Sequence, residues 1–219
     1  FLDFLDKRFH VISPIDMHNK NFDKKKLNVV LSFDDGYESW QTIVAPELQK
    51  RGWGAYFFPS SGFLDTYGNE QQERAFCKEN LLISHRKPLS WDGLRMLSEE
   101  PRFVIGGHTV HHAHLAQLSQ EEQLREIKDD KNRLEHMLQK KVTDFAYPFG
   151  VLGVHVNKNV VANVREAGYA RAFTTEITFT DLSGDPFRHA RVCTEYATSH
   201  MFAYMWIMGG YDLKAILFK

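Results

Sequence analysis

The sequence predicts an α/β fold built on parallel strands, either an open sheet or a barrel. Short apolar runs rich in valine and phenylalanine alternate five or six times with segments of helical periodicity. This order is typical of parallel strands connected by helices. Residues with chemically active side chains follow three of the apolar runs, and in such folds functional residues lie at the carboxyl ends of strands.

The composition indicates one folded domain. The chain has 219 residues, of which 43% are hydrophobic and 25% are charged, so it can bury a core. We expect residues 1–219 to form a single domain, with an N-terminal helix and linker at 1–26 and the core at 27–196. The net charge of -1, without a basic stripe, argues against nucleic acid as a partner.

Location and assembly are weakly determined by the sequence. No apolar run is long enough to span a membrane. Cys77 and Cys193 are far apart and fit free thiols better than a disulfide. The cytoplasm is weakly favoured as the location, and the cell envelope stays open as an alternative because a chain that begins at Phe1 can derive from a longer precursor. The oligomeric state is open.

Apolar periodicity and capping residues predict the elements of the first half of the chain. Ser90 fits the N-cap of a helix that ends near residue 99, and Pro46 is expected to kink or begin another helix. The segment 60–88 is long, polar and mixed, and we expect an excursion with a functional or oligomeric use. The remaining predictions are helices at 1–10 and 39–51 and strands at 11–12, 27–33, 55–59 and 102–106.

The second half of the chain continues the alternation. Ser119, with Glu122 three residues later, fits a capping box and opens a helix to about residue 139. A helix at 156–167 ends at Gly168. Strands are expected at 142–147, 169–174 and 190–196. The aromatic and methionine-rich tail from His200 fits a last helix or a packing surface.

Adjacent aspartates and a group of histidines are candidate metal ligands. Asp34 and Asp35 follow an apolar run, and neighbouring carboxylates repel each other unless a positive charge lies beside them. Asp and Gly also dominate ordinary turns, which explains this motif equally well when it is taken alone. His108 and His112 lie four positions apart, so a tight loop or a helical turn can aim both imidazoles at one point. Four histidines within 108–114 exceed what packing needs, and we expect two of them to bind metal.

Asp35, His108 and His112 together offer one oxygen and two nitrogens. Three protein ligands with an open position describe a catalytic metal site rather than a structural one. This donor set suits Zn²⁺, and Co²⁺, Ni²⁺ and Fe²⁺ accept it as well. Asp34 is then available as a general base, and the chemistry predicted is hydrolysis of an amide or an ester.

Three motifs in this order resemble the polysaccharide deacetylase family, also called the NodB homology or carbohydrate esterase 4 family. They are Phe-Asp-Asp-Gly at 33–36, His-Thr-x-x-His at 108–112 and Tyr-Pro-Phe-Gly at 147–150, and the resemblance covers about 27–196. It implies a distorted (β/α) barrel of about seven parallel strands. It also implies metal-dependent removal of acetyl groups from N-acetylated carbohydrates.

The resemblance assigns roles to individual residues. Asp34 matches the catalytic base, and the metal ligands match Asp35, His108 and His112. Phe149 matches the aromatic residue whose backbone N–H donates to the oxyanion.

Two features depart from the family pattern. Ala146 occupies a position where the third motif often carries an arginine that orients the catalytic aspartate. Arg188 or Arg191 are candidates to supply this charge, and the alternation with neighbouring residues favours Arg191. The late motif that provides a general acid is not recognisable, so His189 and His200 are candidates, and packing or surface roles suit both equally well.

These departures keep other functions open. One alternative is a catalytically degenerate domain that binds glycan without hydrolysing it. Another is a hydrolase of the same fold that acts on a non-sugar amide. The sequence does not distinguish N-acetyl from O-acetyl substrates.

Overall fold

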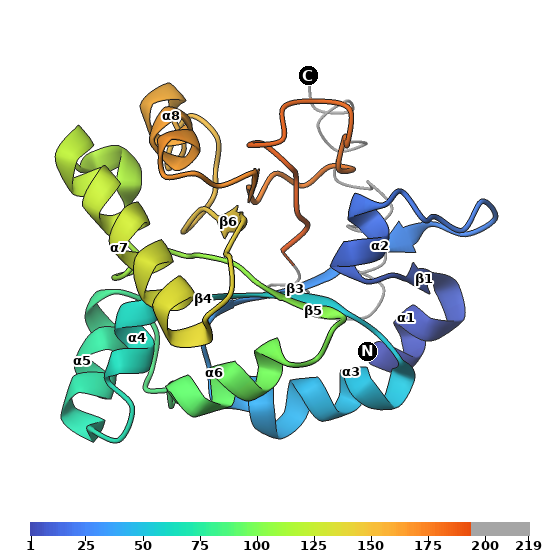
Figure 1. Ribbon diagram of the computed structural model, residues 1–219, viewed down its shortest axis with the longest axis horizontal. Coiled ribbons are helices and arrows are strands. Elements are labelled where there is room, and N and C mark those ends of the chain that lie inside the picture. The colour runs from blue at the N-terminus through green and yellow to red at the C-terminus, as the bar shows by residue number, and fades with distance from the viewer. Residues whose placement is uncertain (194–219) are drawn as a thin grey trace.

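Parallel strands alternate with helices through the part of the chain that the computed structural model describes, residues 1–193 (Figure 1). The strands are β1 (His10–Val11), β2 (Asn28–Val29), β3 (Leu31–Asp35), β4 (Ala55–Pro59), β5 (Phe103–Ile105), β6 (Asp144–Ala146) and β7 (Arg171–Phe173). The helices are α1 (Leu2–Arg8), α2 (Pro14–His18), α3 (Ala45–Arg51), α4 (Ser61–Asp65), α5 (Glu70–Glu79), α6 (Trp91–Ser98), α7 (Gln120–Leu138) and α8 (Lys158–Glu166). A π-helical turn at Trp40–Val44 and a 3₁₀ turn at Leu115–Gln117 complete the set.

The strands pair in parallel in three small sheets: β1 with β2, β3–β4–β5, and β6 with β7. Isolated parallel bridges connect Gly107 with Phe145 and Phe173 with His189, so that the sheets follow one another around a common interior. The parallel α/β prediction is confirmed. Strand pairing among residues 1–193 does not connect all seven strands into one continuous sheet.

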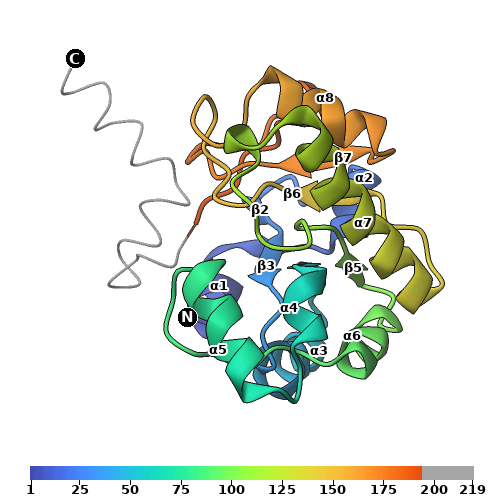
Figure 2. The same cartoon turned by 90° about the vertical axis from the view of Figure 1, so that its left-hand side faces the viewer.

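Alternation along the strands divides the core into two clusters. Phe57 of β4 belongs to the large cluster between the strands and the helices. Tyr56 and Phe58 point the other way and join Phe173 and Ala146 in a smaller interior cluster. Outside the strands, α7 and α8 lie side by side in both views, and α4 packs beside α7 (Figures 1 and 2).

Most predicted elements form within a few residues of their expected limits. Ser90 and Ser119 cap α6 and α7 as predicted, and Ser119 completes the capping box with Glu122. The predicted helix at 39–51 forms as a π turn followed by α3. The change occurs at Pro46, which lies in the first turn of α3, where a residue without an N–H is tolerated.

Three helices were not anticipated. They are α2, which Ser13 begins with a capping box to Asp16, and α4 and α5 within the excursion at 60–88. Of the strand predicted at 190–196, residues up to Cys193 form no strand, and the rest lies outside the described residues, as do His200 and the tail. No helix among residues 1–193 has the length and apolar character needed to cross a bilayer.

Candidate active site

Asp35, His108 and His112 converge at the carboxyl ends of β3 and β5. The Oδ1 atom of Asp35 lies 3.6 Å from Nε2 of His108 and 3.5 Å from Nε2 of His112. The candidate ligand atoms of the three residues all lie within 4.8 Å of one another, which is compact enough to surround one cation. Asp35 ends β3, whereas both histidines lie in the loop that follows β5.

The outer nitrogens of both imidazoles are already engaged. Nδ1 of His108 lies 2.7 Å from the carbonyl oxygen of Ala146, and Nδ1 of His112 lies 3.1 Å from that of Asn80. A carbonyl oxygen only accepts, so each Nδ1 carries hydrogen and each Nε2 faces Asp35, where its lone pair can bind a metal once that nitrogen is deprotonated. Electron-rich atoms that face one another in this way fit a divalent cation, and the N,N,O donor set suits zinc.

Burial and mutual contacts shift the pKa values of all three candidate ligands. Burial opposes charge on Asp35, but contact with His108 and the charge of His112 lower its pKa below the ordinary range. Burial and the charge of His108 lower the pKa of His112 to about 4. Burial works to lower the pKa of His108 as well, but contact with Asp35 and the negative charges of Asp34 and Asp35 raise it. Metal ligands must be deprotonated to bind, so the affinity of this site for a cation should fall in acid.

Four residues of the candidate site adopt left-handed backbone conformations. The φ angles are 80° at Asp35, 65° at Thr109, 50° at His112 and 60° at Phe149. A residue other than glycine pays about 1–3 kcal/mol for such a conformation, and these residues cluster at functional sites.

Asp34 is bound by Arg191. The guanidinium donates to both carboxylate oxygens of Asp34, over 2.7 and 2.8 Å, and to the hydroxyl of Ser32 over 3.2 Å. It also lies 5.4 Å from the ring centre of Phe58. The structure therefore brings Arg191 to the candidate base, whereas Arg188 pairs with Asp185 near the surface.

Phe149 contacts the second histidine of the candidate metal site. Its ring meets that of His112 edge to face, with centres 4.6 Å apart, and stacks on His114 at 4.3 Å. The N–H of Phe149 donates to no group among residues 1–193, and the left-handed backbone turns the following chain sharply. A free N–H next to a cation site is suited to bind a developing oxyanion.

His189 is not part of this arrangement. Its ring packs against Phe173, and Arg171 and Asp144 are the charged side chains that act on it most strongly. Residues two positions apart on an extended segment share a face and lie roughly 7 Å apart along it. His189 therefore faces the interior below Arg191, where burial lowers its pKa.

Two further residues of the site, Tyr37 and Asn80, are not marked in the sequence by a motif as clear as that of the histidines. The hydroxyl of Tyr37 donates to Oδ2 of Asp35 over 2.5 Å, which leaves Oδ1 for the cation. Its position directly after Asp-Asp-Gly is the one available hint.

Asn80 caps α5 and also donates from its side chain to the carbonyl of His111 over 3.0 Å. The excursion at 60–88 therefore supports the loop that carries the candidate metal ligands.

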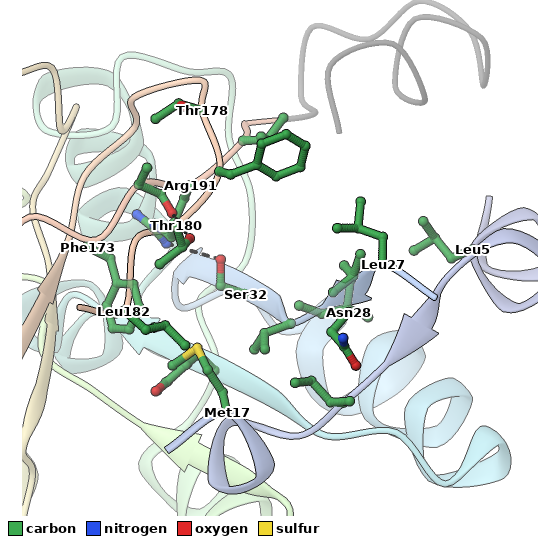
Figure 3. Close-up of a pocket in the computed structure, with 18 of the residues that line it drawn as sticks. Leu5, Met17, Leu27, Asn28, Ser32, Phe173, Thr178, Thr180, Leu182 and Arg191 are labelled. Carbon is green, nitrogen blue, oxygen red and sulfur yellow. Dashed lines mark hydrogen bonds between the residues drawn. The ribbon is translucent and has the colours of Figure 1, made fainter. Parts of the chain in front are cut away.

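A cavity of about 500 Å³ lies between β2–β3 and the segment Ala190–Val192. Arg191 and Ser32 lie on opposite sides of this cavity, and the guanidinium of Arg191 donates to the hydroxyl of Ser32 (Figure 3). Among residues 1–193 no backbone hydrogen bond joins the two sides. The lining is mostly apolar and includes Met17, Leu27 and Phe173.

Comparisons with known proteins identify similar chains. The family model described as polysaccharide deacetylase matches residues 21–172. YxkH of Bacillus subtilis is 25% identical over 148 residues, which cover 68% of this chain and 44% of YxkH. The poly-β-1,6-N-acetyl-D-glucosamine N-deacetylase of Escherichia coli K12 is 33% identical over 81 residues, 37% of this chain and 12% of that protein. This chain thus spans less than half the length of either relative.

Solved structures share the fold. IcaB from Ammonifex degensii superposes with a TM-score of 0.73 at 19% identity, covering 95% of this chain and 85% of that one. The deacetylase PplD of Streptococcus pyogenes, in complex with acetate, gives 0.69 at 20% identity, covering 87% and 76%. At such identities the likeness concerns the fold alone.

Proposed function

Because this chain belongs to the polysaccharide deacetylase family, we propose that it is a metal-dependent enzyme that hydrolyses the acetyl group of an N-acetylated carbohydrate and releases acetate. One observation carries the proposal. A carboxylate fixed by an arginine, Asp34 with Arg191, directly precedes a second carboxylate that faces two histidines. A domain that only binds glycan has no need of this combination of a candidate base and three candidate ligands.

The residues take the following roles in this proposal. Asp35, His108 and His112 hold the cation, with zinc as the first choice and cobalt, nickel or iron as alternatives. When bound, the cation polarises the acetyl carbonyl and favours loss of a proton from water. Asp34 accepts the proton of the attacking water.

Two groups support the reaction from the side. Arg191 keeps the carboxylate of Asp34 in one orientation through its two hydrogen bonds. The N–H of Phe149 donates to the oxyanion that forms at the acetyl carbon. The proposal gives no step to His189, whose ring packs against Phe173.

We further propose a polymer of N-acetylglucosamine as the substrate class. The support is the Escherichia coli relative, which by its name deacetylates poly-β-1,6-N-acetyl-D-glucosamine. We also infer that the strands belong to a distorted barrel of about seven strands, as the resemblance implies.

The test measures acetate release from a substrate panel by protein loaded with zinc or cobalt. The panel contains β-1,6-linked and β-1,4-linked N-acetylglucosamine oligomers, an O-acetylated sugar and a simple formamide. Asp34→Asn should keep one metal per chain and lose activity, whereas Asp35→Ala should lose the metal as well. Asp129→Asn, an exposed change on α7, serves as the control and should behave as wild type.

Each other outcome has a definite meaning. Saccharide binding without acetate release at any metal loading would support the degenerate binding domain. Release from the formamide alone would support the hydrolase of a non-sugar amide. Full activity of Asp34→Asn would refute the assignment of the base.

A further inference from the structure

A carboxylate outside the candidate metal site reaches the backbone of that site. Asp130 lies in the middle of α7 and is completely buried. Its Oδ2 accepts the backbone N–H of His108 over 2.9 Å, and its Oδ1 accepts that of Ser61 over 3.0 Å. Among residues 1–193 no lysine or arginine forms an ion pair with it. Among the described residues, its hydrogen-bond donors are therefore two backbone N–H groups.

These N–H groups belong to neighbouring loops at the same edge of the sheet. Ser61 begins α4 directly after β4, and His108 lies just after β5. The same loops are joined by the hydroxyl of Ser60, which donates to the carbonyl of His108 over 3.1 Å. Asp130 thus links the backbone of His108, the first candidate histidine ligand, to the segment that follows β4.

The surroundings of Asp130 leave it little freedom. A side chain at Gly107 would come within 2.9 Å of Oδ2 of Asp130 and 2.1 Å of the hydroxyl of Tyr169. One helical turn earlier, Glu126 accepts the N–H of His111 over 2.9 Å and contacts Nδ1 of the same ring at 2.7 Å. Residues four apart lie on one helix face, so α7 presents two carboxylates to the loop of metal ligands.

Resting on the proposed metal-dependent function, we propose that Asp130 is a positioning residue for the metal site. It acts through the backbone of His108, whose imidazole it keeps directed at Asp35 before any cation binds. The loop needs such support because Thr109 and His112 hold strained left-handed conformations. A buried carboxylate supplies two strong acceptors at fixed distance, which a neutral side chain of this size cannot.

The first experiment uses Asp130→Asn, which keeps the shape but replaces one acceptor with an amide NH₂. In either orientation one backbone N–H then faces a donor. Zinc affinity, measured by competition with a chelator, should fall by about 10–100-fold, and the visible spectrum of bound Co²⁺ should change. The matched control, Asp129→Asn on the exposed side of α7, should leave both unchanged. A less stable Asp130→Asn variant with wild-type zinc affinity and Co²⁺ spectrum would overturn the proposal.

The second experiment needs no variant. Hydrogen exchange of the His108 amide is measured in wild-type protein with and without zinc. The amide should be protected as strongly as the core of β5 in both states, because Asp130 holds it beforehand. Protection that develops only with zinc would overturn the proposal. If wild-type protein binds no zinc, the proposed function fails, whereas protection of the metal-free amide still tests the anchor by itself.

Discussion

Replacing Arg191 with methionine should lower kcat by about 100-fold while the metal site stays filled. Arg191 donates to both oxygens of Asp34, over 2.7 and 2.8 Å. A hydrogen bond to a charged group contributes about 1.5–3 kcal/mol, and we take the low end because 31% of the Asp34 side chain is exposed. Two such bonds give about 3 kcal/mol, which corresponds to roughly two powers of ten in rate if it all serves to orient the base.

The assay compares three variants for acetate release and for metal content. Arg191→Met should show the full loss. Arg191→Lys should lose about 10-fold, because an ammonium group cannot bind both oxygens in the planar fork of a guanidinium. Arg188→Met is the matched control. Arg188 lies three residues before Arg191, its side chain is 45% exposed, and its Nε lies 3.7 Å from Oδ2 of Asp185. Loss of this exposed ion pair should leave kcat within about twofold of the wild-type value.

Three results would refute this reasoning. Wild-type kcat in Arg191→Met, at one metal per chain, would show that Asp34 needs no partner. Equal losses in Arg191→Met and Arg188→Met would indicate a general effect of positive charge. Loss of metal together with activity would place the role of Arg191 at the metal ligands instead.

Three further predictions concern the stability of the fold. Asp144→Asn should lower the free energy of unfolding by about 3 kcal/mol in urea titrations, because Asp144 is buried and binds Arg171 twice, at 2.7 and 3.1 Å; no measurable change would contradict this. Burial lowers the pKa of His18, so the unfolded state binds its proton more readily and stability should fall as pH drops below about 6.5. His18→Asn should flatten this dependence, and an unaltered pH profile would speak against it. In metal-free protein, His112→Gly should be more stable than His112→Ala, since φ is 50° there, and the reverse order would show that the conformation relaxes.

The sequence predicts the parts of the site that lie close together along the chain. The two aspartates end one strand, and His108 and His112 share one short loop. Their residue types and spacing predict metal chemistry without knowledge of distant contacts. The alternation around Arg191 also predicts this arginine as the partner of Asp34, and its guanidinium donates to both oxygens of that carboxylate.

The supports of the site were not predictable because they come from distant segments. Asn80 is 32 positions from His112, and Asp130 is 22 positions from His108. The excursion that carries Asn80 looked irregular because its helices α4 and α5 are short and polar. Asp130 left one readable signal, since it lies between Ile127 and Leu134 on the apolar face of α7, where a charged residue needs a reason.

The position of the arginine leads to a last prediction. The family pattern often carries arginine where this chain has Ala146, and Ala146 is completely buried against Phe58 and Phe173. The guanidinium of Arg191 lies 5.4 Å from the ring centre of Phe58, which packs in one cluster with Ala146, so we expect an arginine at position 146 to compete with Arg191 for the same interior space. Ala146→Arg alone should therefore destabilise the protein by about 3 kcal/mol through overpacking and a buried charge.

Combining Ala146→Arg with Arg191→Ala should remove much of this penalty, because the new guanidinium can occupy the space that Arg191 leaves. We expect a coupling free energy of at least about 1 kcal/mol in urea titrations, and about 10-fold more activity than in Arg191→Ala. Strictly additive losses would show that the two positions do not share one space. Recovery of activity would mean that the chemistry requires an arginine beside Asp34, and that the segment of the chain that supplies it can change.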